Sequence, residues 1–105
     1  LILWIDANFM NNITLTEASQ KVNLSASYLS RCFKDITGRP FNRYIRDLRI
    51  DCSKKMLLQS NLSIRRIAEI CGFQDQFYFD KVFKKAAGET PGNYRQRHGR
   101  TGLPG

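Results

Sequence analysis

A pattern of residues in the first half of this chain returns in the second half, and this internal repeat narrows the folds that the chain can adopt. The first copy consists of Tyr28, Leu29, Phe33, Lys34, Gly38 and Tyr44. Fifty residues later, the corresponding positions hold Tyr78, Phe79, Phe83, Lys84, Gly88 and Tyr94. Before these positions the separation falls to forty-nine, in the pairs Ser19 and Ala68, Val22 and Cys71, and Leu24 and Phe73. The second copy therefore has one extra residue in a turn, and two copies of one structural unit are expected.

The first copy has the pattern of a short helix, a tight turn and a longer helix. Thr14 or Thr16 can cap a helix that runs to about Val22, because a hydroxyl oxygen accepts a hydrogen bond from a free N–H group at a helix start. After the turn, Ser25 caps a second helix. That helix ends at Gly38, a residue type that readily adopts the left-handed conformation at a helix end.

The second copy has the same order of elements. Ser63 caps a helix that runs to about Cys71, a turn at Gly72 follows, and a helix over about 75–87 ends at Gly88. Each copy thus has the helix-turn-helix arrangement. A duplicated pair of helices with a purely structural role would give the same pattern. The residues on the outward faces of the helices therefore have to distinguish a binding role from a structural one.

Helices are also predicted outside the repeat. Apolar residues at helical spacing indicate a helix over about 1–10, Pro40 opens a long helix to about Gln59, and Pro91 opens a last short helix to about Arg97. No segment alternates as a strand does, so the fold class is all-α. The expected parts are a first helix-turn-helix subdomain, a linker helix, a second helix-turn-helix subdomain and a disordered tail, over residues 1–38, 39–60, 61–97 and 98–105.

The charge of the chain favours a polyanionic partner. The formal net charge is +8, and residues 1–38 carry equal numbers of basic and acidic side chains, so residues 39–105 carry the whole excess. A basic surface attracts nucleic acid. The alternatives are a basic surface that serves solubility, and a helical interaction module that binds an acidic protein.

The sequence argues against several other classes of protein. The only histidine, His98, lies in the basic tail without a neighbouring cysteine or carboxylate, so neither an enzyme nor a cofactor is predicted. Cys32, Cys52 and Cys71 form no C-x-x-C pair, and we interpret them as core residues in a reducing cytoplasm. The sequence has no stretch apolar enough for a membrane span and no signal-peptide pattern at its start.

The long helix of the first copy has an apolar stripe and an opposite polar face. The predicted stripe consists of Tyr28, Leu29, Cys32, Phe33 and Ile36, and the polar face of Ala26, Ser27, Ser30, Arg31 and Lys34. Small polar groups near the start of a helix suit the base edges of a DNA major groove, and the basic groups behind them suit phosphates. The start of the helix, at Ser25, can also hold a phosphate. The alternative is an ordinary solvated face.

The corresponding helix of the second copy has a different outward face. Its predicted stripe is Tyr78, Phe79, Val82, Phe83 and Ala86, and its outward residues are Gln76, Phe77, Asp80, Lys81 and Lys84. Gln76 can pair with adenine, Lys81 with guanine, and Asp80 can accept a hydrogen bond from cytosine. Phe77 can contact a thymine methyl group, or it can fold back onto the helix pair. Asp80 can instead form an ion pair with Lys84.

The predicted linker helix is apolar on one side and basic on the other. The apolar side consists of Tyr44, Ile45, Leu48, Cys52 and Met56, and the basic side of Arg39, Arg43, Arg46 and Lys54. Four basic side chains on one side shift the interpretation from a solvated face towards a surface that contacts DNA phosphates.

These motifs identify a known family by resemblance. The chain resembles the AraC/XylS family of bacterial regulators over about residues 1–97, in the segments Asn23-Leu24-Ser25-x-Ser27-Tyr28-Leu29-Ser30-Arg31-x-Phe33-Lys34, Ile67-Ala68-x-x-Cys71-Gly72-Phe73, Asp75-x-x-Tyr78-Phe79-x-Lys81-x-Phe83-Lys84-Lys85 and Gly88-x-Thr90-Pro91-x-x-Tyr94-Arg95. It departs from the usual family pattern at Cys71, Phe77 and Lys81. The last two departures bear on the DNA sequence that the second unit reads.

The resemblance implies seven helices and specific binding of double-stranded DNA, with the helices near 26–37 and 75–87 reading two successive major grooves. By family position, the base-edge candidates are Ser27, Ser30, Arg31, Gln76, Phe77, Asp80 and Lys81. The phosphate candidates are Ser25, Lys34, Arg43, Arg46 and Lys84. The resemblance also implies an activator that contacts RNA polymerase, with an effector or dimerisation domain N-terminal to this fragment. The predicted location is the bacterial cytoplasm.

Overall fold

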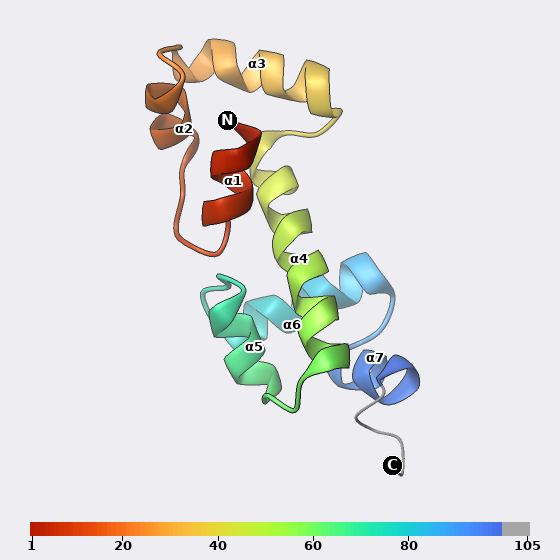
Figure 1. Cartoon of the computed structure of the whole chain (residues 1–105). Coiled ribbons are helices and arrows are strands. Elements are labelled where there is room, and N and C mark those ends of the chain that lie inside the picture. Colours follow the sequence, from red (N-terminus) through yellow and green to blue (C-terminus); the bar gives the residue numbers. More distant parts are fainter. Residues whose placement is uncertain (100–105) are drawn as a thin grey trace. The chain divides into compact units, whose positions relative to one another are not determined.

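The computed structural model describes residues 1–99, and over these residues the chain folds into helices without strands (Figure 1). The seven helices along the chain are α1 (Ile2–Asn8), α2 (Leu15–Lys21), α3 (Ala26–Thr37), α4 (Phe41–Gln59), α5 (Ile64–Ile70), α6 (Gln76–Ala87) and α7 (Pro91–His98). The predicted all-α fold with seven helices is confirmed. Within residues 1–99, none of these helices combines the length and the hydrophobicity that crossing a membrane requires.

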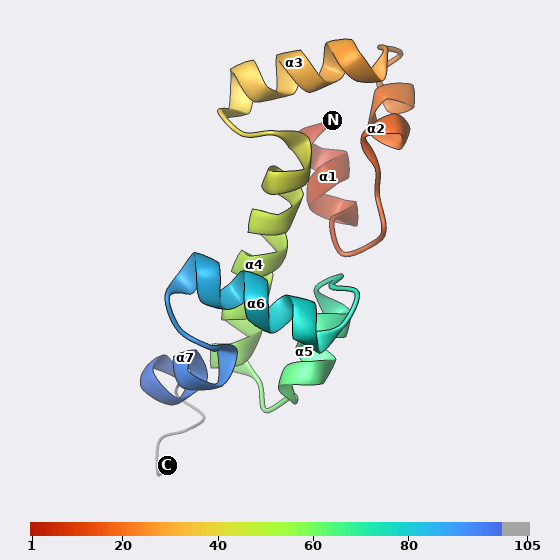
Figure 2. The same cartoon turned by 180° about the vertical axis from the view of Figure 1, so that it is seen from behind.

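The chain divides into two compact units, Leu1–Leu48 and Arg49–Gly105. In each unit a short helix is followed by a tight turn and a longer helix, α2 before α3 and α5 before α6 (Figure 1, Figure 2). The linker helix α4 is not a separate body, because its first half packs into the core of the first unit and its second half into the core of the second.

The core of the first unit is built on α3 and the start of α4. Its buried residues are Ile5, Ala18, Leu29, Phe33, Phe41 and Ile45. The ring of Phe33 meets the rings of Phe41 and Tyr44 edge to face, with centroids 5.4 and 5.1 Å apart. Such aromatic pairs add a favourable contact to the burial of apolar area.

The core of the second unit contains more aromatic rings. Its buried residues are Ile50, Leu57, Ile67, Ala68, Cys71, Phe73, Phe79 and Phe83. The centroid of Phe79 lies 4.8 Å from that of Phe73 and 5.6 Å from that of Phe83. Phe83 also meets Tyr94 edge to face at 5.4 Å, the counterpart of the contact between Phe33 and Tyr44 in the first unit.

The predicted helix caps are present. The side-chain oxygens of Thr14, Ser25 and Ser63 accept hydrogen bonds from the N–H groups of the third residue onward, at 3.1, 3.2 and 3.1 Å. Gly38 and Gly88 end α3 and α6 with φ of 78° and 81°, the left-handed conformation in which glycine has no steric penalty. Both long helices of the repeat are therefore delimited as the sequence predicts.

The turns inside the two units share a hydrogen bond and a left-handed residue. The Leu24 N–H donates to the Ser19 carbonyl at 3.0 Å, and the equivalent bond joins the Phe73 N–H to the Ala68 carbonyl at 2.9 Å. Asn23 has a φ of 58° in the first turn, and its counterpart Gly72 has a φ of 96° in the second. The extra residue of the second copy lies after this bond, so the tight part of the turn is the same in both units.

The predicted apolar stripes of α3 and α6 are partly wrong. Tyr28 and Ile36 are exposed, as are their counterparts Tyr78 and Ala86. The buried side of α3 is instead turned towards Ala26, Ser30 and Thr37, which are half-buried. Leu29 and Phe33 are the buried residues at the centre of this side. The smaller residues beside them allow neighbouring helices to approach closely.

Three further expectations need correction. The stripe predicted for α4 omits Ile50 and Leu57, which are buried because the second half of α4 faces a different core from the first. Cys71 is buried, but Cys32 and Cys52 are only half-buried, and all three are free thiols. The predicted disordered tail begins too early, because His98 is the last residue of α7; positions 100–105 lie outside the described residues.

Candidate nucleic-acid interface

The outward face of α3 presents two of its three base-edge candidates. Ser27 and Arg31 are exposed, and Lys34 is exposed in the last turn, whereas Ser30 is half-buried. Arg31 forms no ion pair with any described residue. Its guanidinium group is therefore available to a base edge or a phosphate.

Ser25 has a structural role at the start of α3. Its Oγ accepts the hydrogen bond from the Tyr28 N–H, and the residue itself is exposed. A hydroxyl group that accepts one hydrogen bond still has its own hydrogen to donate. Ser25 can therefore cap the helix and bind a phosphate oxygen at the same time.

The outward face of α6 presents an aromatic ring. Phe77 is 82% exposed, so it does not fold back onto the helix pair, and this part of the expectation is settled in favour of a solvent-facing ring. Gln76, Lys81 and Lys84 are exposed beside it. The ring is therefore accessible to a partner from solvent.

Asp80 does not lie fully on this face. It is half-buried, and its Oδ1 atom is shielded from solvent and accepts no hydrogen bond from a described residue. The alternative ion pair between Asp80 and Lys84 is also absent among the described residues. The same rotation that half-buries Ser30 in α3 half-buries Asp80, its counterpart in α6.

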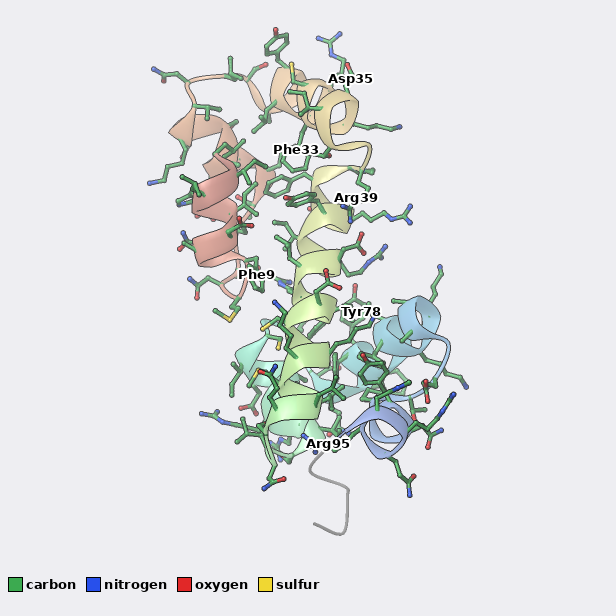
Figure 3. The ribbon with its side chains drawn as sticks, turned by 45° about the vertical axis from the view of Figure 1, so that its right-hand side comes forward. Phe9, Phe33, Asp35, Arg39, Tyr78 and Arg95 are labelled. Carbon is green, nitrogen blue, oxygen red and sulfur yellow. The ribbon has the colours of Figure 1, made fainter. Side chains whose placement is uncertain are left out.

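The basic residues near α4 are not equivalent. Arg43 and Arg46 are exposed, and neither forms an ion pair with a described residue. Arg39 lies just before α4 (Figure 3). Its Nη1 is instead 2.6 Å from Oδ2 of Asp47, and its guanidinium carbon is 5.3 Å from the centre of the Tyr44 ring. Lys54 is half-buried. The candidate phosphate surface of α4 therefore rests on Arg43 and Arg46.

Two features of the surface were missed at the level of the sequence. Lys85 is exposed beside Lys84 in the last turn of α6, and the adjacent pair of lysines was the signal that could have found it. His98 was expected to have no carboxylate neighbour, but its Nε2 lies 3.6 Å from Oε2 of Glu89, and its ring is 4.8 Å from that of Tyr94. The sequence does not indicate this contact, because Glu89 lies just before α7 and His98 lies at its end, nine residues later.

The donor groups of this surface do not form a metal centre. Among residues 1–99, no three His, Cys, Asp or Glu side chains come close enough to hold a metal ion together. The outward faces of α3 and α6 instead offer cations, one amide, hydroxyl groups and an aromatic ring, which are the groups that contact phosphates and base edges.

Comparison with known proteins agrees with this chemistry. A family model described as a helix-turn-helix domain matches residues 18–97. The bifunctional transcriptional activator/DNA repair enzyme AdaA of Bacillus subtilis is 37% identical over 93 residues, which are 89% of this chain and 44% of that protein. The uncharacterized HTH-type transcriptional regulator YpdC of Escherichia coli is 33% identical over 94 residues, which are 90% of this chain and 33% of that protein. The chain thus spans less than half of the length of these relatives.

A solved structure extends the likeness to the fold. The C-terminal domain of AraT, a response regulator from Geobacillus stearothermophilus, matches with a TM-score of 0.91 at 32% identity, and the match covers 98% of this chain and 86% of that one. The two helix-turn-helix units described above are thus the fold of a known class of domain. The chain belongs to the AraC/XylS family of transcriptional regulators, of which it carries the helix-turn-helix DNA-binding domain.

Proposed function

We propose that this chain binds one specific, asymmetric site on double-stranded DNA, with α3 reading one major groove and α6 the next. The observation that carries the proposal is the contrast between the two units. Residues 28–39 and 78–89 are buried and exposed in the same pattern, yet the exposed residues Ser27, Arg31 and Asp35 of α3 correspond to Phe77, Lys81 and Lys85 of α6. Two recognition helices with unlike outward faces read unlike half-sites.

The roles of the individual residues follow from their exposure. On α3, Ser27 and Arg31 contact base edges, and Ser30 is less accessible to them. On α6, Gln76 and Lys81 contact base edges by hydrogen bonds. The phosphate contacts come from Ser25, Lys34, Arg43, Arg46 and Lys84, which are all exposed.

Phe77 and Asp80 are expected to determine which bases the second unit prefers. The exposed ring of Phe77 suits a thymine methyl group, which is the apolar feature of the major groove. Asp80 can accept a hydrogen bond from cytosine only after its carboxylate turns outward, because its Oδ1 is shielded from solvent. A carboxylate oxygen without a donor is unfavourable when buried, so a donor from a base would relieve that cost.

We further propose that the full-length protein is a cytoplasmic activator with an additional effector or dimerisation domain and a contact to RNA polymerase. The support is the name of AdaA, a transcriptional activator, and the small share of each relative that this chain spans. AdaA is also named as a DNA repair enzyme, but the family match here covers the helix-turn-helix domain. We therefore assign no enzymatic activity and no cofactor to this chain.

The test of specific binding is selection from randomised DNA duplexes. The protein is expected to enrich one asymmetric sequence that spans about two helical turns. Against that sequence, Arg31→Ala is expected to lose about 1–3 kcal/mol of binding free energy and to relax the preference at one position. Arg65→Ala removes the same charge from α5, where the side chain is 80% exposed, and serves as the matched control.

Three outcomes would contradict the proposal or part of it. Enrichment of no sequence, with binding that depends only on salt, would reduce the function to general DNA binding. Equal losses on every sequence for Arg31→Ala would make Arg31 a phosphate contact. An acidic protein partner that excess unrelated duplex DNA does not displace would favour the competing function of a protein-interaction module.

A further inference from the structure

Three sulfur atoms gather in the second unit, at a place that the DNA-binding function does not use. Within residues 1–99, no His, Asp or Glu completes a set of three possible metal ligands with the two cysteines. Cys52 and Met56 are one helical turn apart on α4 and so lie on the same face of that helix. Cys71, at the end of α5, places its Sγ 3.7 Å from the Sδ of Met56. Cys52 and Met56 both pack against the core cluster that contains Cys71.

The two thiols also interact with each other. Burial raises the pKa of the Cys71 thiol, and its hydrogen bond with Cys52 raises that pKa further. A metal ion binds the thiolate, so an ion that binds Cys71 has to displace the thiol proton.

The same group is well suited to a soft cation. Thiolate and thioether ligands favour soft metal ions, whereas hard ions need oxygen ligands, which this group lacks. An ion about 2.3 Å from each of two sulfur atoms that are 3.7 Å apart would subtend an angle of roughly 107°, which three- and four-coordinate ions accept. The Met56 and Cys71 sulfur atoms are therefore already spaced as ligands of one ion.

We propose that Cys52, Met56 and Cys71 form a binding site for one soft cation, of which Cu(I) is the physiological example. Binding forms a metal–sulfur bond to each cysteine, and each bond releases the thiol proton to solvent, so no oxidant or reductant is needed. The half-buried Cys52 and Met56 provide the side from which the ion enters, and the buried Cys71 closes the site.

Occupation of this site would link α4 to α5 and stabilise the second unit. An ion that binds only the folded state raises the free energy of unfolding according to its concentration relative to its Kd. Met56 and Cys52 belong to the half of α4 that packs in the second unit, and Cys71 precedes the turn into α6. The stabilisation is therefore expected in the second unit alone.

The experiment is a titration of the reduced full chain with Cu(I) in the absence of oxygen, in competition with a chromophoric Cu(I) chelator. One ion per chain is expected. Cys52→Ser and Met56→Leu, which keep the approximate shape of each side chain, are each expected to weaken binding at least tenfold. Cys32→Ser removes a half-buried thiol from the first unit and serves as the matched control, with unchanged affinity.

A second measurement separates loss of the site from loss of the fold. The thermal midpoint of the metal-free variants reports their folding, and the rise of that midpoint on adding Cu(I) reports the site. The rise is expected in the wild type and in Cys32→Ser, and not in Cys52→Ser. Unchanged affinity in Cys52→Ser and Met56→Leu would overturn the proposal, as would equal loss in Cys32→Ser or equally tight binding of Mg(II).

Discussion

In the first unit α3 presents Ser27 and Arg31 to solvent, whereas in the second unit α6 presents Phe77 and Lys81 at the corresponding positions. The positions that are buried, in contrast, coincide: Leu29 and Phe33 match Phe79 and Phe83. The two units thus share their fold through the residues that face inward. The outward residues are free of that constraint: Lys34 and Lys84 are alike, but Ser27 and Arg31 differ from Phe77 and Lys81, as a protein that reads two different half-sites requires.

The prediction with the largest effect concerns the buried phenylalanines that occupy corresponding positions in the two cores. Phe83→Ala is expected to lower the free energy of unfolding of the second unit by about 3–5 kcal/mol, because Phe83 is fully buried between Phe79 and Tyr94. Phe33→Ala is expected to lower that of the first unit by a similar amount. Urea denaturation followed by residue-specific NMR signals separates the two units.

The control for these variants is Phe77→Ala, which removes the same ring from an exposed position and is expected to leave both unfolding transitions in place. If Phe33→Ala and Phe83→Ala each moved the transitions of both units equally, the two units would unfold as one body. The comparison of two separately packed units would then be wrong.

The second prediction concerns an arginine that has no counterpart in the first unit. Arg95 of α7 donates hydrogen bonds to the carbonyl oxygens of Leu57 and Ser60, at 3.0 and 3.2 Å, where α4 ends (Figure 3). Fifty residues earlier the repeat has Ile45, which is buried in an apolar core. Arg95→Met is expected to cost the second unit about 1–3 kcal/mol, because both carbonyl groups lose a charged donor.

Chemical denaturation of Arg95→Met measures this cost, and Arg65→Met is the matched control. Arg65 is 80% exposed on α5, so its loss is expected to change the free energy of unfolding by less than about 0.5 kcal/mol. Equal effects of the two substitutions would show that Arg95 does not hold the end of α4.

The sequence predicted the features of this fold that depend on local chemistry. The repeat, the caps at Ser25 and Ser63 and the terminal glycines are local signals, and the structure contains them all. The rotation of α3 and α6 about their axes was predicted poorly, because it depends on how closely other helices approach. That rotation moved Ser30 and Asp80 towards the core and Ile36 into solvent.

The candidate site was predictable to the extent that exposure follows from helix periodicity. The exposed positions of Arg31 and Lys81 were predicted, and the structure has them exposed. For Phe77 the sequence left two orientations open, and the structure has its ring exposed. The engagement of Arg39 with Asp47 was not predicted, since the two residues are eight positions apart and meet only because the chain turns before α4. Which exposed residues contact DNA depends on the partner and is tested by the duplex selection.

The third prediction compares the left-handed residues of the two turns. Gly72 has a φ of 96°, and an L-residue other than glycine pays about 1–2 kcal/mol in the left-handed region, so Gly72→Ala is expected to destabilise the second unit by that amount. Gly72→Asn, which copies Asn23 of the first turn, is expected to cost less, because asparagine tolerates this conformation better. Thermal unfolding ranks the variants, and an equal cost for Ala and Asn would contradict the equivalence of the turns.

The smallest predicted effect concerns an ion pair that both units possess with its charges reversed. In the first unit Arg39 lies 2.6 Å from Asp47, and at the corresponding positions of the second unit Glu89 lies 3.3 Å from Arg97. The repeat thus has opposite charges at these two positions in both units, but the basic and acidic positions are exchanged. Reversal of one pair, in the double variant Arg39→Glu with Asp47→Arg, makes the first unit resemble the second.

Each single reversal is expected to destabilise the first unit, and the double variant is expected to recover part of the loss. The coupling energy from the double-mutant cycle is expected to be about 0.2–1 kcal/mol, since partly exposed pairs are weak. It is expected to shrink as salt is added, because dissolved ions screen exposed charges. The stacking of Arg39 on Tyr44 is lost in the double variant, so recovery is expected to be incomplete. A coupling energy of zero would mean that the repeated pair reflects the geometry of the turn alone and adds nothing to the stability of the unit.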